Sequence, residues 1–132
     1  MSNHGHDSIQ TPLGRVRYLG SAKSGTKHFW RQRLTAVAMI PLTIAVVIII
    51  VGLLGRNQAA VVQILGSTFV AITMLLFIVT SVYHMWLGMQ VIIEDYVHDE
   101  MLKYVTLMGN TFFSFAVGLT AVFAILKLSF GF

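Results

Sequence analysis

Three long runs without a charged residue constrain this chain more than any other feature. Leu34 to Leu54, Ala59 to Ile93 and Tyr104 to Leu126 contain no Asp, Glu, Lys or Arg. As helices, the first and third runs would measure about 31 and 34 Å, close to the roughly 30 Å thickness of a bilayer's hydrocarbon core. Barrel strands alternate apolar and polar residues, and these runs do not. We therefore predict an all-α membrane protein with three transmembrane helices.

Short polar segments set the expected helix boundaries. Residues 55–58 separate the first two runs, and Glu94 to Lys103 separates the last two. We expect helices at about 29–55, 59–94 and 101–128, within one membrane domain covering 28–132. Residues 1–27 show no apolar periodicity and are expected to form a cytoplasmic tail. A continuous second helix would reach about 50 Å, so one of its ends should project from the bilayer.

The composition excludes several classes of function. Hydrophobic residues make up 56% and charged residues 11% of the chain, whereas about a quarter of the residues are charged in soluble proteins. The absence of cysteine excludes disulfides, cysteine zinc sites and iron–sulfur ligation. A net charge of +4 does not indicate nucleic-acid binding, because most basic residues cluster ahead of the first apolar run. These six are Arg15, Arg17, Lys23, Lys27, Arg31 and Arg33.

The same basic residues predict the orientation of the chain in the membrane. Together with Lys103 they lie on one side, and Arg56 and Lys127 lie on the other. The positive-inside rule then places the N-terminus in the cytoplasm and the C-terminus in the periplasm. We expect a bacterial inner membrane, with the mitochondrial inner membrane as the alternative.

His84 is the only histidine within a charge-free run. Ionisable groups at membrane depth are costly and commonly mark function. Gly88, one helical turn later, removes side-chain bulk where a flat ligand would approach, so the pair has the character of one wall of a haem site. An interhelical hydrogen bond without any cofactor explains His84 equally well from spacing alone. If two protein groups ligate the haem, the second must come from another chain or copy.

A stretch of fourteen residues resembles a known family. His84-Met85-Trp86-Leu87-Gly88-Met89-Gln90-Val91-Ile92-Ile93-Glu94-Asp95-Tyr96-Val97 is similar to the signature of the smaller, D-type membrane anchor of succinate dehydrogenase, respiratory complex II. Gly20 to Trp30 and Arg33 to Ala36 resemble the family's entry into its first helix. The resemblance covers residues 20 to 126. It implies that the three helices form half of a heterodimeric bundle with a C-type anchor subunit.

The resemblance implies a set of haem-binding residues. His84 would be an axial ligand of haem b, with the opposite ligand supplied by the C-type anchor. Gly88 would pack against the haem, and Arg33 and His28 would hold its propionates. Without the resemblance, positive-inside anchoring is sufficient to explain Arg33.

The resemblance also implies a quinone site, at the end of the second helix. Tyr96 would donate a hydrogen bond to ubiquinone, and Asp95 beside it would orient a basic group or relay protons. Read alone, Tyr96 is an interfacial aromatic anchor and Asp95 is a solvated acid that ends a helix.

The implied function is that of a subunit of an enzyme, succinate dehydrogenase, that cannot catalyse the reaction alone. A flavoprotein oxidises succinate, an iron–sulfur subunit passes the electrons on, and this chain anchors both to the membrane and helps to bind haem b and ubiquinone. Two alternatives are a small proton-coupled transporter that uses His84 and Asp95 and a structural anchor without a cofactor. The sequence does not determine whether the complex oxidises succinate or works in the opposite direction, as a fumarate reductase does. It also does not determine the type of quinone.

One further pattern concerns packing. Asn110, Ser114 and Gly118 recur every four residues in the third run. Small and polar residues at this spacing favour close helix–helix packing over catalysis.

Overall fold

The computed structural model describes residue 11 and residues 23–132, so most of the expected tail at 1–27 lies outside the described residues. The helices are α2 (Lys23–Leu53), α3 (Gln58–Gly66), α4 (Thr68–Tyr96) and α5 (Glu100–Phe130). No strand occurs in this part of the chain. The helical segments Gly25–Leu53, Thr68–Tyr96 and Glu100–Phe130 are long and apolar enough to cross a membrane. The predicted all-α fold with three spans is confirmed.

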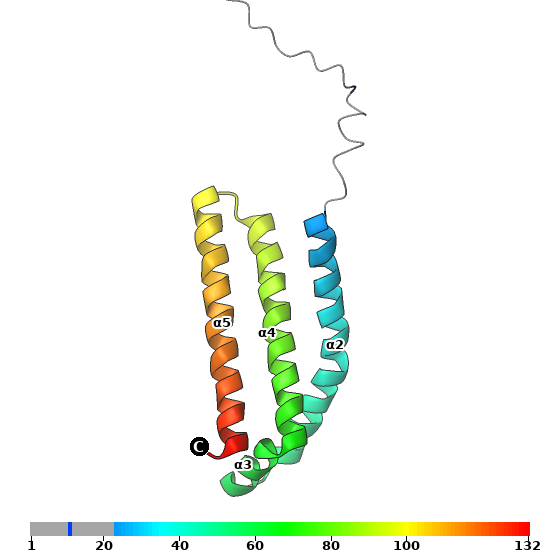
Figure 1. The fold of residues 1–132 in the computed structure, drawn as a ribbon, viewed down its shortest axis with the longest axis vertical. Helices are drawn as coiled ribbons and strands as arrows, with labels where there is room; N and C mark the ends of the chain where they lie inside the picture. The colour runs from blue at the N-terminus through cyan, green and yellow to red at the C-terminus, as the bar shows by residue number, and fades with distance from the viewer. Residues whose placement is uncertain (1–10, 12–22) are drawn as a thin grey trace, which may run out of the picture.

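Helix α4 is the centre of the arrangement. It packs against α2 on one side and α5 on the other, and the short α3 contacts both α4 and α5. Figure 1 shows that the start of α2 and the turn between α4 and α5 lie at the same end of the molecule. Helix α3 and the C-terminus lie at the opposite end. The beginning of α2 and the Asp95-Tyr96 pair at the end of α4 therefore share one end of the bundle.

The prediction of a single helix over 59–94 is wrong, because the helix is interrupted at Ser67. This residue ends α3 and begins α4 with an extended backbone, at φ −67° and ψ 140°. Its hydroxyl donates to the carbonyl oxygen of Ile64 at 2.7 Å, a local bond of the kind by which serine competes with the helical backbone. The break turns α3 aside, and α4 alone is about 44 Å long.

Helix α2 begins earlier than expected, at Lys23 instead of residue 29. The expected boundary lay only a few residues before the apolar run at Leu34, whereas the helix includes further polar residues ahead of it. As a result His28 belongs to α2 itself. The helix also continues through Pro41, which a membrane helix tolerates when neighbouring groups satisfy the freed carbonyl.

Local capping explains where α3 and α5 start and where α5 ends. The side chain of Asn57 accepts a hydrogen bond from the Ala60 backbone N–H at 2.9 Å, at the start of α3. Asp99 caps α5 in the same way, accepting from the Leu102 N–H at 2.7 Å. Gly131 ends α5 with a left-handed backbone at φ 73°. These are the residue types that favour helix ends.

The bundle has a thin core. Among the described residues, the buried hydrophobic side chains are Val46, Ala71, Leu87, Ile93 and Ile125. Large apolar side chains lie on the outside instead, including Leu34, Phe69 and Phe115, which are 72%, 83% and 69% exposed. Apolar surface of this extent requires lipid or other membrane-embedded helices to cover it.

Polar contacts join α4 to α5 at mid-length. The Asn110 amide donates to the backbone carbonyl of Trp86 at 3.1 Å, and the Trp86 indole N–H donates to the Thr111 hydroxyl at 3.1 Å. Asn110 and Ser114 are buried, and an added Cβ at Gly118 would lie 3.3 Å from Val82 Cγ1. The expected packing role of the four-residue repeat is therefore confirmed.

Gly66 provides a test of the α3–α5 contact. A Cβ at this position would lie 2.7 Å from the backbone oxygen of Leu128, and a backbone atom cannot rotate away as a side chain can. Gly66→Ala should therefore destabilise the folded protein by about 1–3 kcal/mol, measured by thermal unfolding in detergent. Gly52→Ala is the matched control, because nothing lies within 4 Å of its added Cβ. Equal stability of the two variants would contradict this packing.

Candidate functional site

A cavity of about 430 Å³ lies between α2 and α4 and contains three of the residues expected at the haem site. Helix α2 supplies His28 and Arg33, and α4 supplies His84 from the opposite wall. The complete lining is Gly25, His28, Phe29, Gln32, Arg33, Ala36, His84 and Val91. Two segments about fifty residues apart in sequence thus bring their predicted residues to one place.

The imidazole of His84 uses one of its two nitrogens within the chain. Its Nδ1 lies 2.9 Å from the Thr35 hydroxyl of α2, so the interhelical hydrogen bond considered for this histidine is present. No residue in the described part of the chain forms a hydrogen bond with Nε2. Because neutral imidazole binds iron through a ring nitrogen, this hydrogen bond and metal ligation can coexist.

Two buried polar atoms in the cavity lining have no hydrogen-bond partner. They are His28 Nε2 and Gln32 Oε1. A buried polar group without a partner costs about 1–3 kcal/mol, and in native proteins such groups usually meet a ligand, an ion or water. A ligand that brought polar groups into the cavity would offer these atoms partners. Gln32 was not among the residues predicted from the sequence, although its position one helical turn after His28 places the two on the same face of α2.

Arg33 lies at the edge of the cavity with its charge accessible. Its guanidinium carbon is 5.2 Å from the centre of the Phe29 ring, a cation–π contact worth about 0.5–1 kcal/mol at an exposed site. The contact leaves the N–H groups of the guanidinium free to bind an anion through two parallel hydrogen bonds.

Gly88 marks the close approach of α2 to α4. A Cβ added here would lie 3.5 Å from Gln32 Nε2, which is ordinary van der Waals contact. Gly88 is not among the residues that line the cavity. Packing against a haem therefore stays a prediction for this residue.

Asp95 and Tyr96 lie apart from the cavity, in the last turn of α4. Twelve residues separate Tyr96 from His84, about 18 Å along a helix. The tyrosine side chain is 77% exposed, and neither residue lines the His84 cavity. The expected quinone residues thus lie outside the cavity lining, with Tyr96 five residues beyond Val91 of that lining.

The chain does not offer a complete set of metal ligands around His84. Among the described residues, no group of three or more His, Asp or Glu side chains is placed to hold a metal ion. A metal at His84 would need its remaining donors from elsewhere. A porphyrin provides four nitrogen donors, so a haem iron requires at most one or two protein ligands.

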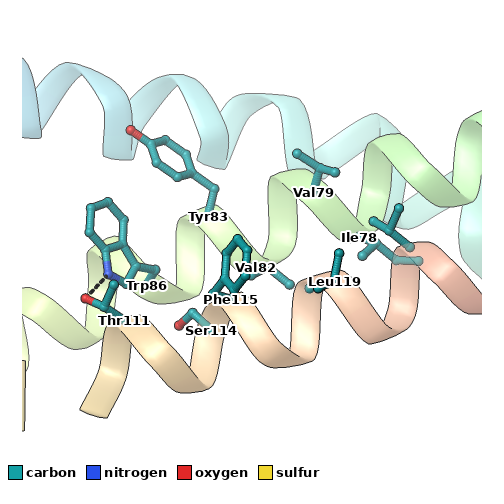
Figure 2. A pocket seen from close by; sticks show the side chains of 11 residues that line it. Ile78, Val79, Val82, Tyr83, Trp86, Thr111, Ser114, Phe115 and Leu119 are labelled. Atoms are coloured by element: carbon teal, nitrogen blue, oxygen red, sulfur yellow. Dashed lines mark hydrogen bonds between the residues drawn. The ribbon is translucent and has the colours of Figure 1, made fainter. Parts of the chain in front are cut away.

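A second cavity lies between α4 and α5, again about 430 Å³ in volume. Figure 2 shows its lining of mostly aliphatic and aromatic side chains, with the Trp86 indole bonded to Thr111 at one end. Tyr83 stacks on Trp86 with their ring centres 5.7 Å apart. Its lining carries no acid, base or metal ligand apart from the Tyr83 phenol. This cavity is therefore better explained by helix packing than by a catalytic or metal-binding role.

Fold and site together define a class of protein: a small membrane protein of three spans, with a histidine that lines a cavity between two of them. The family model for the succinate dehydrogenase/fumarate reductase transmembrane subunit matches residues 7–125. The chain belongs to this family. The membership confirms the resemblance seen in the sequence, and it goes against the transporter alternative.

Curated relatives agree with the family assignment. The succinate dehydrogenase hydrophobic membrane anchor subunit of Paracoccus denitrificans is 30% identical over 121 residues, which are 92% of this chain and 93% of the relative. The protein of the same name from Rickettsia bellii is 28% identical over 106 residues, covering 80% and 85%. The succinate dehydrogenase membrane anchor subunit of Reclinomonas americana is 33% identical over 88 residues, covering 64% and 73%. No solved structure matches the chain.

Gly88 tests the approach of α2 to α4. Gly88→Ala should keep the stability of the wild type, because the new Cβ would make an ordinary contact with Gln32. Gly88→Leu should lower the free energy of unfolding by about 1–3 kcal/mol, since the larger side chain must displace Gln32. Thermal unfolding of both variants in detergent measures the difference. A Leu variant as stable as the Ala variant would argue against this helix pairing.

Proposed function

We propose that this chain is the D-type anchor of a succinate dehydrogenase in a bacterial inner membrane, where it shares a haem b with a C-type anchor and contributes to a ubiquinone site. The observation that carries the proposal is the His84 cavity. His84, whose Nε2 has no hydrogen-bond partner among the described residues, lines the same cavity as His28 and Arg33, and all three positions match the family motifs.

The side chains in the cavity fit a haem. His84 Nε2 is suited to bind the iron, and His28 Nε2, buried without a partner, is suited to donate to a propionate. Arg33 adds a positive charge for the second propionate. Rotating the Gln32 amide by 180° would put its NH₂ group, a donor, where the unpaired Oε1 now lies. When bound, haem would supply an iron that accepts and returns single electrons. The protein's part is to orient the group and shield it from water.

Tyr96 is the proposed hydrogen-bond donor to ubiquinone. Its exposed phenol can donate to a quinone carbonyl oxygen and stabilise the negative charge that develops during reduction. Asp95, next to it, would orient a basic group or relay protons. Since both side chains are exposed at the end of α4, we propose that the partner subunits complete this site.

The proposed partners are a C-type anchor, an iron–sulfur subunit and a flavoprotein. Apolar faces of α2, α4 and α5 provide surface for the C-type anchor, which would supply the second haem ligand. The end that carries Tyr96 would face the cytoplasm and the soluble subunits, with the C-terminus in the periplasm, as the basic residues predict. Electrons from succinate would then reach quinone at the surface where the subunits dock.

Replacement of His84 tests the haem proposal. His84→Leu in the purified complex should lose most of its haem, because the iron would lose an axial ligand, and the absorption spectrum would record this. His98→Leu is the matched control, since His98 is exposed in the turn between α4 and α5. An unchanged haem spectrum in the His84 variant would refute the ligand role. A wild-type complex without haem would favour the structural anchor.

Replacement of Tyr96 tests the quinone proposal. Tyr96→Phe removes only the phenolic hydroxyl and should slow quinone reduction by about tenfold to a hundredfold, with succinate oxidation by an artificial acceptor and complex assembly unchanged. Tyr104→Phe, at a similarly exposed tyrosine in α5, should be neutral. Quinone reduction at the normal rate in the Tyr96 variant would exclude the donor role.

A further inference from the structure

Thr35 is the described residue that holds His84 from the opposite helix. It is half-buried on α2, and its hydroxyl lies 2.9 Å from His84 Nδ1. The same hydroxyl lies 2.8 Å from the backbone oxygen of Arg31 and 3.0 Å from that of Gln32. One oxygen atom therefore connects the imidazole to the backbone of α2, one turn closer to the N-terminus.

The number of protons that Thr35 can donate indicates which atom is the donor in each of these hydrogen bonds. A threonine hydroxyl has one proton to donate and lone pairs to accept with. Donation to a carbonyl three or four residues earlier is common for threonine in a helix. With its proton directed to Arg31 and Gln32, Thr35 can only accept at the third contact. His84 Nδ1 must then carry the hydrogen.

The opposite arrangement leaves a donor without a partner. If Thr35 donated to Nδ1, the hydrogen of the neutral imidazole would sit on Nε2. No hydrogen bond of the described residues involves Nε2, so its N–H would have no acceptor within this part of the chain, and a donor without an acceptor is unfavourable. Both considerations favour the tautomer with hydrogen on Nδ1 and a lone pair on Nε2.

We infer that Thr35 is a positioning residue for His84: its hydroxyl accepts the Nδ1–H and thereby fixes both the tautomer and the rotation of the ring. The Nε2 lone pair is then presented to the cavity before any ligand arrives. This inference rests on the proposed haem ligation. Histidines that bind metals in proteins usually donate their other ring N–H in this way, which makes the ligating nitrogen more basic.

The test uses three variants in the complete membrane complex. Thr35→Val removes the hydroxyl and keeps the side-chain shape, whereas Thr35→Ser keeps the hydroxyl. Thr120→Val is the matched control, because the exposed Thr120 hydroxyl bonds only to the Ala116 backbone oxygen, at 2.8 Å. Two readouts are the rate of haem transfer to excess apomyoglobin and the haem midpoint potential from a spectroelectrochemical titration.

Thr35→Val should release haem about tenfold faster than the wild type. Its midpoint potential should rise, because a less basic imidazole stabilises ferric iron less. The Ser variant and the Thr120 control should match the wild type. Thr35→Ala also removes the hydroxyl and serves as the test variant if the Val variant does not assemble.

Two results would overturn the inference. One is a hydroxyl-free variant with the wild-type release rate and potential. The other is an equal defect in Thr35→Ser, which would trace the effect to shape instead of the hydrogen bond. His84→Leu, measured in parallel, separates the two proposals. Normal haem in that variant refutes the ligation itself, whereas loss of haem there beside an unaffected Thr35→Val refutes only the role of Thr35.

Discussion

Hydrocarbon offers no hydrogen-bond partner, and this constraint governs the whole structure. Backbone groups satisfy one another inside the helices, so the polar side chains within the spans determine where the helices join. His84 bonds to Thr35 of α2, and the Trp86 carbonyl accepts from Asn110 of α5. His84 and Trp86 are two residues apart on α4 and contact different helices. The central position of α4 follows, with its imidazole held against α2.

Several features of this chain suit a subunit of a larger membrane complex. With few buried side chains and broad apolar faces, the three spans form a slender layer instead of a closed bundle. The cavity beside His84 contains polar atoms that the chain itself does not satisfy, and Tyr96 is exposed. Each of these features would be unfavourable in an isolated protein, and each is suited to a subunit whose ligands and neighbours lie outside its own chain.

The features that could be predicted from the sequence are those with a local signal. The three long runs without a charged residue identified the three spans. The four-residue repeat that starts at Asn110 identified a helix face that packs against a neighbour. The break at Ser67 was missed because serine and glycine occur freely inside membrane helices, so Gly66-Ser67 carried no distinct signal. The start of α2 was misplaced because hydropathy marks the part of a helix that lies in hydrocarbon. It does not mark the polar turns that precede it.

The sequence by itself determined three things: the anchor family, the three spans, and His84 as the candidate ligand. It could do so because spacing and hydropathy are properties of the linear chain. The tertiary structure alone decided that Thr35 and Gln32 stand opposite α4, that His28 leaves a ring nitrogen unpaired in the same cavity, and that Tyr96 lies apart from them. Thr35 and His84 are 49 residues apart. Helical periodicity predicts which residues share a face, but the faces that meet depend on how side chains of two helices interlock.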